Sequence, residues 1–140
     1  MKVIILGAGK VGESLARNLS QDGYDISIVD LNKNKVDELQ DRLDIAAIIG
    51  HAAHPSTFKK AGADEETILL AVTNNDEVNI AACQIAKNKF SVKKTICRFK
   101  DSTYLDCLDS FGESIIDIPI SPENEVTSHL KELIDHPGAE

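Results

Sequence analysis

The sequence predicts an α/β fold in which one parallel, six-stranded sheet is doubly wound, with helices on both of its faces. Short apolar runs alternate with amphipathic stretches along the chain, as in strands that are joined by helices. The apolar runs are nearly continuous, which is typical of strands buried on both faces. The chain has 140 residues, of which 42% are hydrophobic, so it fits one domain with a substantial core.

Turn and capping residues indicate where the predicted strands and helices begin and end. The predicted strands are residues 2–6, 25–30, 45–49, 67–72, 94–98 and 114–118. The predicted helices are residues 10–21, a helix that follows Asn32, a short helix that ends at Gly62, a longer helix capped by Asn74 or Asn75, and residues 101–111. Because a helix separates each pair of consecutive strands, every connection is a crossover and the strands are parallel.

Composition and charge exclude several classes of protein. The formal net charge is −8 and aromatic residues make up 4%, so a nucleic-acid-binding surface is not expected. Residues 1–100 hold 14 basic and 13 acidic residues, whereas residues 101–140 hold 1 and 10. No apolar run approaches the roughly 18 residues of a membrane span, so direct membrane insertion is not expected. The three cysteines (Cys83, Cys97 and Cys107) form no CxxC pair, and we expect small core residues in a reducing, cytoplasmic compartment.

The sharpest motif is the glycine-rich stretch GAGKVG at residues 7–12, which follows the first predicted strand and opens the first helix. Gly7 allows the tight turn, Gly9 lets a pyrophosphate approach the backbone, and Gly12 lets helix and strand pack closely. The phosphates would then lie against the N–H groups at the start of the helix. A tight turn that holds no ligand is the alternative interpretation.

Asp30 is the acidic residue that completes the pattern begun by the glycine motif. It stands at the end of the second predicted strand, 21 residues after Gly9, where the Rossmann pattern places an acidic residue. A carboxylate there accepts hydrogen bonds from the adenine-side ribose hydroxyls and repels a 2′-phosphate. The sequence therefore predicts a Rossmann-like nucleotide-binding domain that prefers NAD to NADP.

Polar residues follow the fourth and fifth predicted strands at the same edge of the sheet. Thr73 and Asn74 can contact the ribose or pyrophosphate of a bound cofactor, although helix capping alone explains them equally well. Arg98 can bind a phosphate or carboxylate, and a surface ion pair is its alternative.

Two histidines, His51 and His54, follow the third predicted strand. Their spacing places no third ligand, so a metal site is not expected. We expect instead that the loop of Gly50 and His51 lies beside the adenine or the ribose.

No catalytic residue is predicted. After the six strands only about 20 residues remain, which is too few for a substrate-binding domain. No His-Asp pair or Ser-Lys arrangement is evident in the sequence. The sequence therefore indicates a nucleotide-binding module without enzyme activity, and a cofactor domain cut from a dehydrogenase is the alternative.

Several stretches together resemble the N-terminal RCK/KTN domains (TrkA-N) of Trk potassium-uptake regulators. The stretches that carry the resemblance are MKVIILGAGKVGESLARNL, DISIVD, GHAAHP, AVTNNDEVNIAACQIAK and CRFKDSTYL. They cover essentially the whole chain, and the combination of GHAAHP with VTNNDEVN is not general to Rossmann dehydrogenases. Full-length members of this family carry further domains, so we expect the chain to be a fragment or a short member.

The resemblance implies a domain that binds NAD(H), or adenine nucleotides such as ATP and ADP, and has no enzyme activity. It implies that the domain gates a membrane-embedded potassium transporter from the cytoplasmic face and assembles as a homodimer or a larger ring. The implied ligand residues are Gly7, Gly9, Lys10, Val11 and Gly12 at the phosphates, Asp30 at the ribose, His51 and Ala52 near the adenine, and Thr73, Asn74 and Arg98 as further contacts. Ala8 and Leu31 complete the set.

The last residues predict a separate unit. Pro119–Pro122 indicates a rigid connector, and a final helix runs from there to about Asp135. Its apolar stripe consists of Val126, Leu130, Leu133 and Ile134. We therefore expect a nucleotide-binding domain over 1–118, and a connector and amphipathic dimerisation helix over 119–140. A C-terminal crossover helix that packs on a second protomer is favoured, and packing on its own sheet is the alternative.

Overall fold

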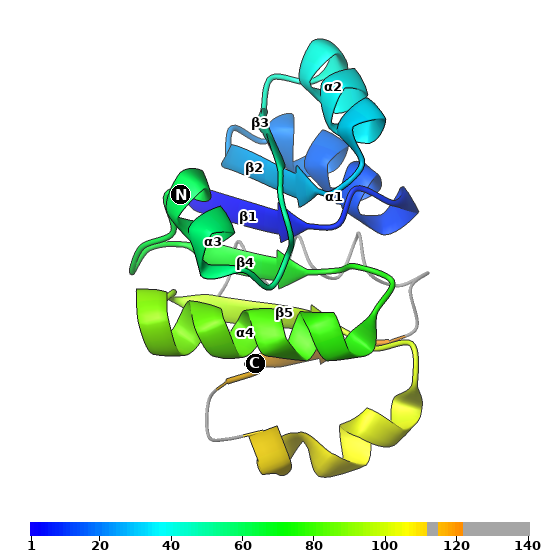
Figure 1. The fold of residues 1–140 in the computed structure, drawn as a ribbon, viewed down its shortest axis with the longest axis vertical. Coiled ribbons are helices and arrows are strands. Elements are labelled where there is room, and N and C mark those ends of the chain that lie inside the picture. Colours follow the sequence, from blue (N-terminus) through cyan, green and yellow to red (C-terminus); the bar gives the residue numbers. More distant parts are fainter. Residues whose placement is uncertain (112–114, 122–140) are drawn as a thin grey trace.

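A six-stranded parallel sheet forms the centre of the molecule (Figure 1). The structure is a computed structural model, which describes residues 1–111 and 115–121. The strands are β1 (Lys2–Leu6), β2 (Asp25–Asp30), β3 (Ala46–Ile49), β4 (Ile68–Ala71), β5 (Lys94–Arg98) and β6 (Ile118–Ile120). Their order in the sheet is β3-β2-β1-β4-β5-β6. Strands β1 to β3 therefore follow one another towards one edge of the sheet, and β4 to β6 follow one another towards the other edge. This order confirms the predicted doubly wound fold and places the switch point between β1 and β4.

The helices cover both faces of this sheet. They are α1 (Lys10–Ser20), α2 (Lys33–Arg42), α3 (Pro55–Ala61), α4 (Asp76–Phe90) and the 3-10 helix η1 (Ser102–Phe111). Buried side chains of α1 and α2 pack on one face with Val3 and Ile5, and those of α3 and α4 pack on the other with Ile4 and Leu6. Successive residues of β1 therefore belong to two different cores, which explains why its apolar run is continuous.

Short polar side chains begin the helices where the sequence predicts. The Asn32 side chain accepts a hydrogen bond from the N–H of Lys35 at the start of α2. Asn75, rather than Asn74, caps α4 by accepting from the N–H of Val78. These caps satisfy N–H groups that have no partner inside the helix.

The sixth strand lies later in the sequence than predicted. It spans Ile118–Ile120 instead of 114–118. The Asp117 side chain accepts a hydrogen bond from the N–H of Thr95 at 2.9 Å, and the Asp117 N–H donates to the Thr95 carbonyl at 3.2 Å. Regular pairing with β5 starts only after this side-chain contact. Pro119, predicted to begin a connector, therefore lies in the strand, where its missing N–H is tolerated because β6 is an edge strand.

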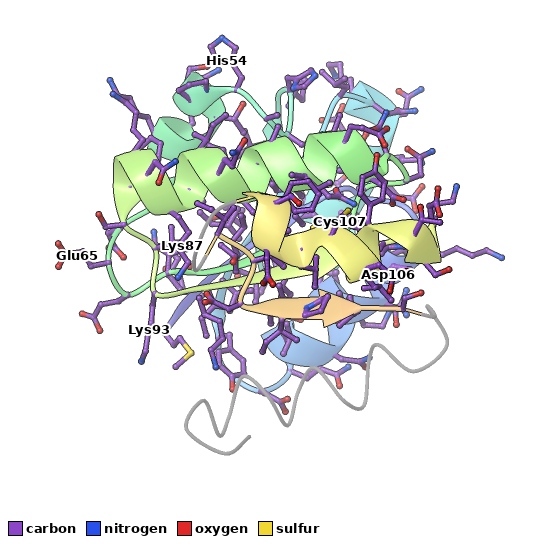
Figure 2. All side chains as sticks on the ribbon, turned by 90° about the horizontal axis from the view of Figure 1, so that it is seen from below. His54, Glu65, Lys87, Lys93, Asp106 and Cys107 are labelled. Atoms are coloured by element: carbon purple, nitrogen blue, oxygen red, sulfur yellow. The ribbon has the colours of Figure 1, made fainter. Side chains whose placement is uncertain are left out.

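The predicted helix over residues 101–111 is a 3-10 helix, η1, with a non-helical Cys107 (φ −129°, ψ 26°). It lies at the β6 end of the sheet, where Figure 2 labels Asp106 and Cys107. None of its residues is buried. Its apolar residues Tyr104, Leu108 and Phe111 pack against the core but are only partly buried. This limited packing favours a regular α-helix less, because most helical stability in proteins comes from packing.

Tyr104 attaches η1 to the rest of the domain. Its ring lies 5.6 Å from that of Phe99 and 6.1 Å from that of Phe111. Its hydroxyl donates a hydrogen bond to the Glu77 carboxylate in α4. This hydrogen bond, together with burial and the negative charge of Glu77, raises the pKa of Tyr104 to about 12.

The final helix that the sequence predicts, and its apolar stripe, lie outside the described residues. The division of the chain at residue 118 and the dimerisation helix therefore stay predictions. Among the residues that the structure describes, no helix combines the length and apolar character needed to cross a bilayer. Within the same residues, no three His, Cys, Asp or Glu side chains gather as metal ligands would.

Candidate nucleotide-binding site

A pocket of about 600 Å³ opens at the carboxyl edge of the sheet, over the switch point. Ligands of doubly wound folds bind at this place. The pocket brings together most of the predicted site residues, namely Gly7, Gly9, Lys10, Val11, Asp30, Leu31, His51, Ala52, Thr73, Asn74 and Arg98. The other two, Ala8 and Gly12, are buried beside it rather than in its lining. Lining residues that sequence reasoning did not single out for the site include Val29, Asn32, Lys35, Val72, Asn75 and Val78.

The three glycines of the first loop have different reasons to be glycine. Gly7 has a φ of 106°, and a Cβ there would lie 2.9 Å from the Cα of Thr73. A Cβ on Gly12 would lie 1.7 Å from the carbonyl oxygen of Gly7. At Gly9 a Cβ would meet nothing within 4 Å, and the φ of −77° suits any residue. The turn and close packing predicted for Gly7 and Gly12 are therefore confirmed, whereas the fold itself does not demand glycine at position 9.

The first turn of α1 is open towards the pocket. Gly9 is the N-cap residue and supplies no side-chain hydrogen bond, whereas α2, α3 and α4 are each capped by a side chain. The N–H groups at the start of α1 therefore lack a capping acceptor and carry the positive end of the helix dipole. Lys10 and Val11, which line the pocket, lie in this turn. This arrangement suits an anionic group such as a phosphate.

Asp30 is held in place by the backbone on both sides. One carboxylate oxygen accepts a hydrogen bond from the N–H of Ala8 at 2.8 Å, and the other accepts from the N–H of Asn32 at 2.8 Å. Each carboxylate oxygen has a second acceptor site, so Asp30 can still bind two hydroxyl groups. The residue is half-buried and lines the pocket, which suits a ribose contact.

Arg98 is buried rather than at the surface. The residue is 8% exposed, and Nη1 donates hydrogen bonds to the carbonyls of Thr73 at 3.0 Å and Val72 at 3.3 Å. Arg98 is therefore not a surface residue, and its role as a phosphate or carboxylate partner stays a prediction. A guanidinium that is fixed by two carbonyls and lines the pocket places positive charge at the β5 end of the site.

The hydroxyl of Thr73 faces inward. It donates a hydrogen bond to Oδ1 of Asn79 at 2.6 Å and accepts one from the N–H of Asn75 at 3.2 Å. Thr73 therefore lines the pocket, but its hydroxyl and its backbone N–H already donate hydrogen bonds to Asn79. Asn79, which sequence reasoning missed, is fully buried. Its signal in the sequence is a polar residue on the face of α4 that also carries Ile80 and Cys83.

The two histidines play different parts. His51 lines the pocket, and its Nδ1 accepts a hydrogen bond from the N–H of Ala53 at 3.0 Å. In the neutral ring the proton then lies on Nε2, which makes this atom a donor. His54 caps α3 by accepting from the N–H of Ser56 and is not in the pocket lining.

The three cysteines differ in how deeply they are buried. Cys83 and Cys97 are fully buried in one cluster, which confirms the expectation for these two residues. The thiol of Cys83 and burial both raise the pKa of the Cys97 thiol, so it stays protonated and unreactive. Cys107 is half-buried on η1, so the prediction of a core position is wrong there.

Comparison with known sequences agrees with the motifs. The sequence model of the TrkA-N domain matches residues 3–122. A Trk system potassium uptake protein TrkA from Vibrio alginolyticus is 45% identical over 99% of this chain, and one from Halomonas elongata is 43% identical over 99%. The chain spans only 31% of the length of either relative.

Comparison with solved structures agrees with the fold. The TrkA-N domain of the Escherichia coli inner membrane protein ybaL superimposes with a TM-score of 0.73 and 21% identity, covering 95% of this chain and 96% of that one. An NAD(P)-binding domain of an exopolyphosphatase-related protein from Archaeoglobus fulgidus gives 0.75 and 20%, covering 95% and 96%. Since the TrkA-N model spans nearly the whole chain, this protein belongs to the TrkA-N domain family.

Proposed function

We propose that this chain binds an adenine-containing nucleotide, NAD(H) or ATP/ADP, in the pocket over the switch point. We further propose that it regulates, without enzyme activity of its own, a membrane system for potassium uptake. The observation that carries the nucleotide proposal is the open space at Gly9. A glycine that neither φ nor packing demands is explained if a phosphate occupies that space, next to the uncapped first turn of α1.

The remaining lining of the pocket supports the same ligand class. Asp30 offers acceptors to a ribose, and His51 offers a donor beside it. Lys10, Lys35 and Arg98 line the pocket with positive charge, which suits a polyanionic phosphate chain. An unmodified ribose is common to NAD(H), ATP and ADP, so these residues admit all of them.

The regulatory role is supported by what the similar proteins are called. The relatives at 38–45% identity are named Trk system potassium uptake protein TrkA. Structures of similar fold include the GsuK channel bound to NAD, GsuK bound to ADP, and a Shewanella denitrificans Kef C-terminal domain bound to AMP. From these names we infer a membrane-embedded potassium transporter subunit as partner, contact with it at the cytoplasmic face, and a homodimer or larger ring as the assembly.

Side-by-side calorimetric titration with NAD⁺, NADH, ATP and ADP tests the ligand. We expect at least one of them to bind at one site per chain, and binding of none would refute the nucleotide proposal. A parallel assay for NADH oxidation with common 2-hydroxy and 2-keto acids tests the alternative of a dehydrogenase fragment. Turnover of any of these substrates would contradict the proposal that the chain is a regulator without enzyme activity of its own.

A further inference from the structure

We propose that Asn79 is the positioning residue of this pocket, which sets the β4 and β5 end of the site for the part of a nucleotide beyond its first phosphate. The inference rests on the proposed nucleotide binding and adds a residue to it. Asn79 lies in α4 and is not among the lining residues of the pocket. Its action must therefore pass through Thr73 and Arg98, which do line it.

The Asn79 side chain makes four hydrogen bonds to these two residues. Its Oδ1 accepts from the N–H of Thr73 at 3.0 Å and from the Thr73 hydroxyl at 2.6 Å. Its Nδ2 donates to the carbonyl of Thr73 at 3.1 Å and to the carbonyl of Arg98 at 3.0 Å. One buried side chain thus joins the loop after β4 to the end of β5.

Only a carboxamide satisfies this set of partners. Two donors face Oδ1 and two acceptors face Nδ2, which matches the full capacity of an asparagine side chain. A carboxylate has no donor for the two carbonyls. An apolar side chain removes all four hydrogen bonds and leaves the Thr73 N–H and the Arg98 carbonyl without the partner that Asn79 supplies. Because Asn79 is 0% exposed, water cannot replace the lost hydrogen bonds.

The Thr73 carbonyl transmits this restraint to the pocket. It accepts from Asn79 Nδ2 and also from Arg98 Nη1, at 3.1 Å and 3.0 Å. The same oxygen therefore fixes the peptide after β4 and the guanidinium that lines the site. A shift of Thr73 would therefore disturb one of the carbonyls that hold the guanidinium of Arg98.

The sheet order separates this end of the pocket from the end that would hold the adenosine. Asp30 ends β2, whereas Arg98 ends β5, and β1 and β4 lie between these strands. AMP needs only the glycine loop and the Asp30 end. ADP and NAD⁺ extend beyond the first phosphate, so a defect at Thr73 and Arg98 should affect them and spare AMP.

Calorimetric titration of the chain with AMP, ADP and NAD⁺ tests this assignment. Asn79→Leu keeps the branching and the number of heavy atoms of the side chain and adds no charge. It should weaken the binding of ADP and NAD⁺ by about tenfold or more, the effect of at least one lost buried hydrogen bond. AMP affinity should change by less than about twofold, since its contacts are retained. If Asn79 had only a structural role, Asn79→Leu would instead weaken the binding of AMP, ADP and NAD⁺ alike.

A matched pair of isosteric variants keeps the test decisive if Asn79→Leu fails to fold. Thr73→Val and Thr95→Val each remove one hydroxyl that donates and accepts a hydrogen bond, but only Thr73 bonds to Asn79. Thr73→Val should lower the affinity for ADP relative to AMP, and Thr95→Val should leave that ratio unchanged. An unchanged ratio in Thr73→Val, or an equal shift in both variants, would overturn the role of Asn79. If the parent chain binds none of the ligands, the proposed function itself has failed.

Discussion

The carboxylate of Asp30, at the end of β2, accepts a hydrogen bond from the backbone N–H of Ala8, in the glycine loop after β1, at 2.8 Å. The candidate ribose-binding group is thereby tied to the candidate phosphate loop before any ligand arrives. The second oxygen of Asp30 is held by the N–H of Asn32. A site whose polar groups are fixed in advance loses less conformational entropy on binding.

Replacement of Asp30 by alanine should weaken nucleotide binding by tenfold or more. A carboxylate bound to both ribose hydroxyls makes charge-assisted hydrogen bonds of about 1.5–3 kcal/mol each, and about 1.4 kcal/mol corresponds to a factor of ten. Titration calorimetry of Asp30→Ala measures the loss. Asp41→Ala, at an exposed position of α2, is the control and should bind as the parent does. Equal affinities of the parent and a folded Asp30→Ala would contradict the ribose site.

NADP(H) should bind more weakly than NAD(H), because Asp30 would face the 2′-phosphate. By sequence position Lys33 is the nearest cation, but its Nζ lies 2.6 Å from Asp37, which also raises the pKa of Lys33. Lys35 lines the pocket instead. In a competition titration, NAD(H) should therefore displace NADP(H), and Lys35→Ala should widen the difference. A preference of the parent chain for NADP(H) would count against the proposed site.

Alanine substitutions at two glycines of the loop should have different effects, one on nucleotide binding and the other on the stability of the fold. Gly9→Ala places its Cβ in open space, so the unfolding free energy should change by less than about 1 kcal/mol while nucleotide binding is lost. Gly12→Ala drives its Cβ into the Gly7 carbonyl and should destabilise the fold by about 3 kcal/mol or more. Urea denaturation and calorimetry measure both quantities. Full nucleotide affinity in Gly9→Ala would remove the main support for the proposed function.

Asp117 should contribute to stability through the start of β6. Its Oδ2 accepts from the buried Thr95 N–H and lies 2.8 Å from Nζ of Lys87, a residue of α4 that Figure 2 labels. Asp117→Ala leaves that N–H without its acceptor and should cost about 1–3 kcal/mol in urea denaturation. The matched control is Asp37→Ala, which breaks the exposed pair with Lys33 and should give no measurable change. Similar losses in both variants would contradict the assignment.

The predicted apolar stripe of the last residues should mediate self-association. Sedimentation of the parent chain should show a dimer, and Leu130→Glu should shift it to a monomer because a charge would enter the apolar contact. Association should strengthen with salt, since the acidic C-terminal residues repel one another. A parent chain that is monomeric at all concentrations, or a Leu130→Glu variant that dimerises equally, would refute this role.

Local sequence was sufficient for most strands, because an apolar run bounded by turn residues has few other solutions in a chain of this length. The start of β1 at Lys2 and the end of β2 at Asp30 agree with prediction. Prediction was wrong at the last strand and at η1. There the deciding contacts, such as that of Asp117 with Thr95, join residues far apart in the sequence.

By itself the sequence determined the fold class, the glycine loop and the place of Asp30, because these depend on backbone conformation and on residue order along one βαβ unit. Only the tertiary structure decided which polar groups are used inside the protein. It turned the Thr73 hydroxyl inward, buried Arg98 and placed Asn79 between them. Such choices depend on which donors and acceptors meet where β4, α4 and β5 pack together, and burial requires each of them to find a partner.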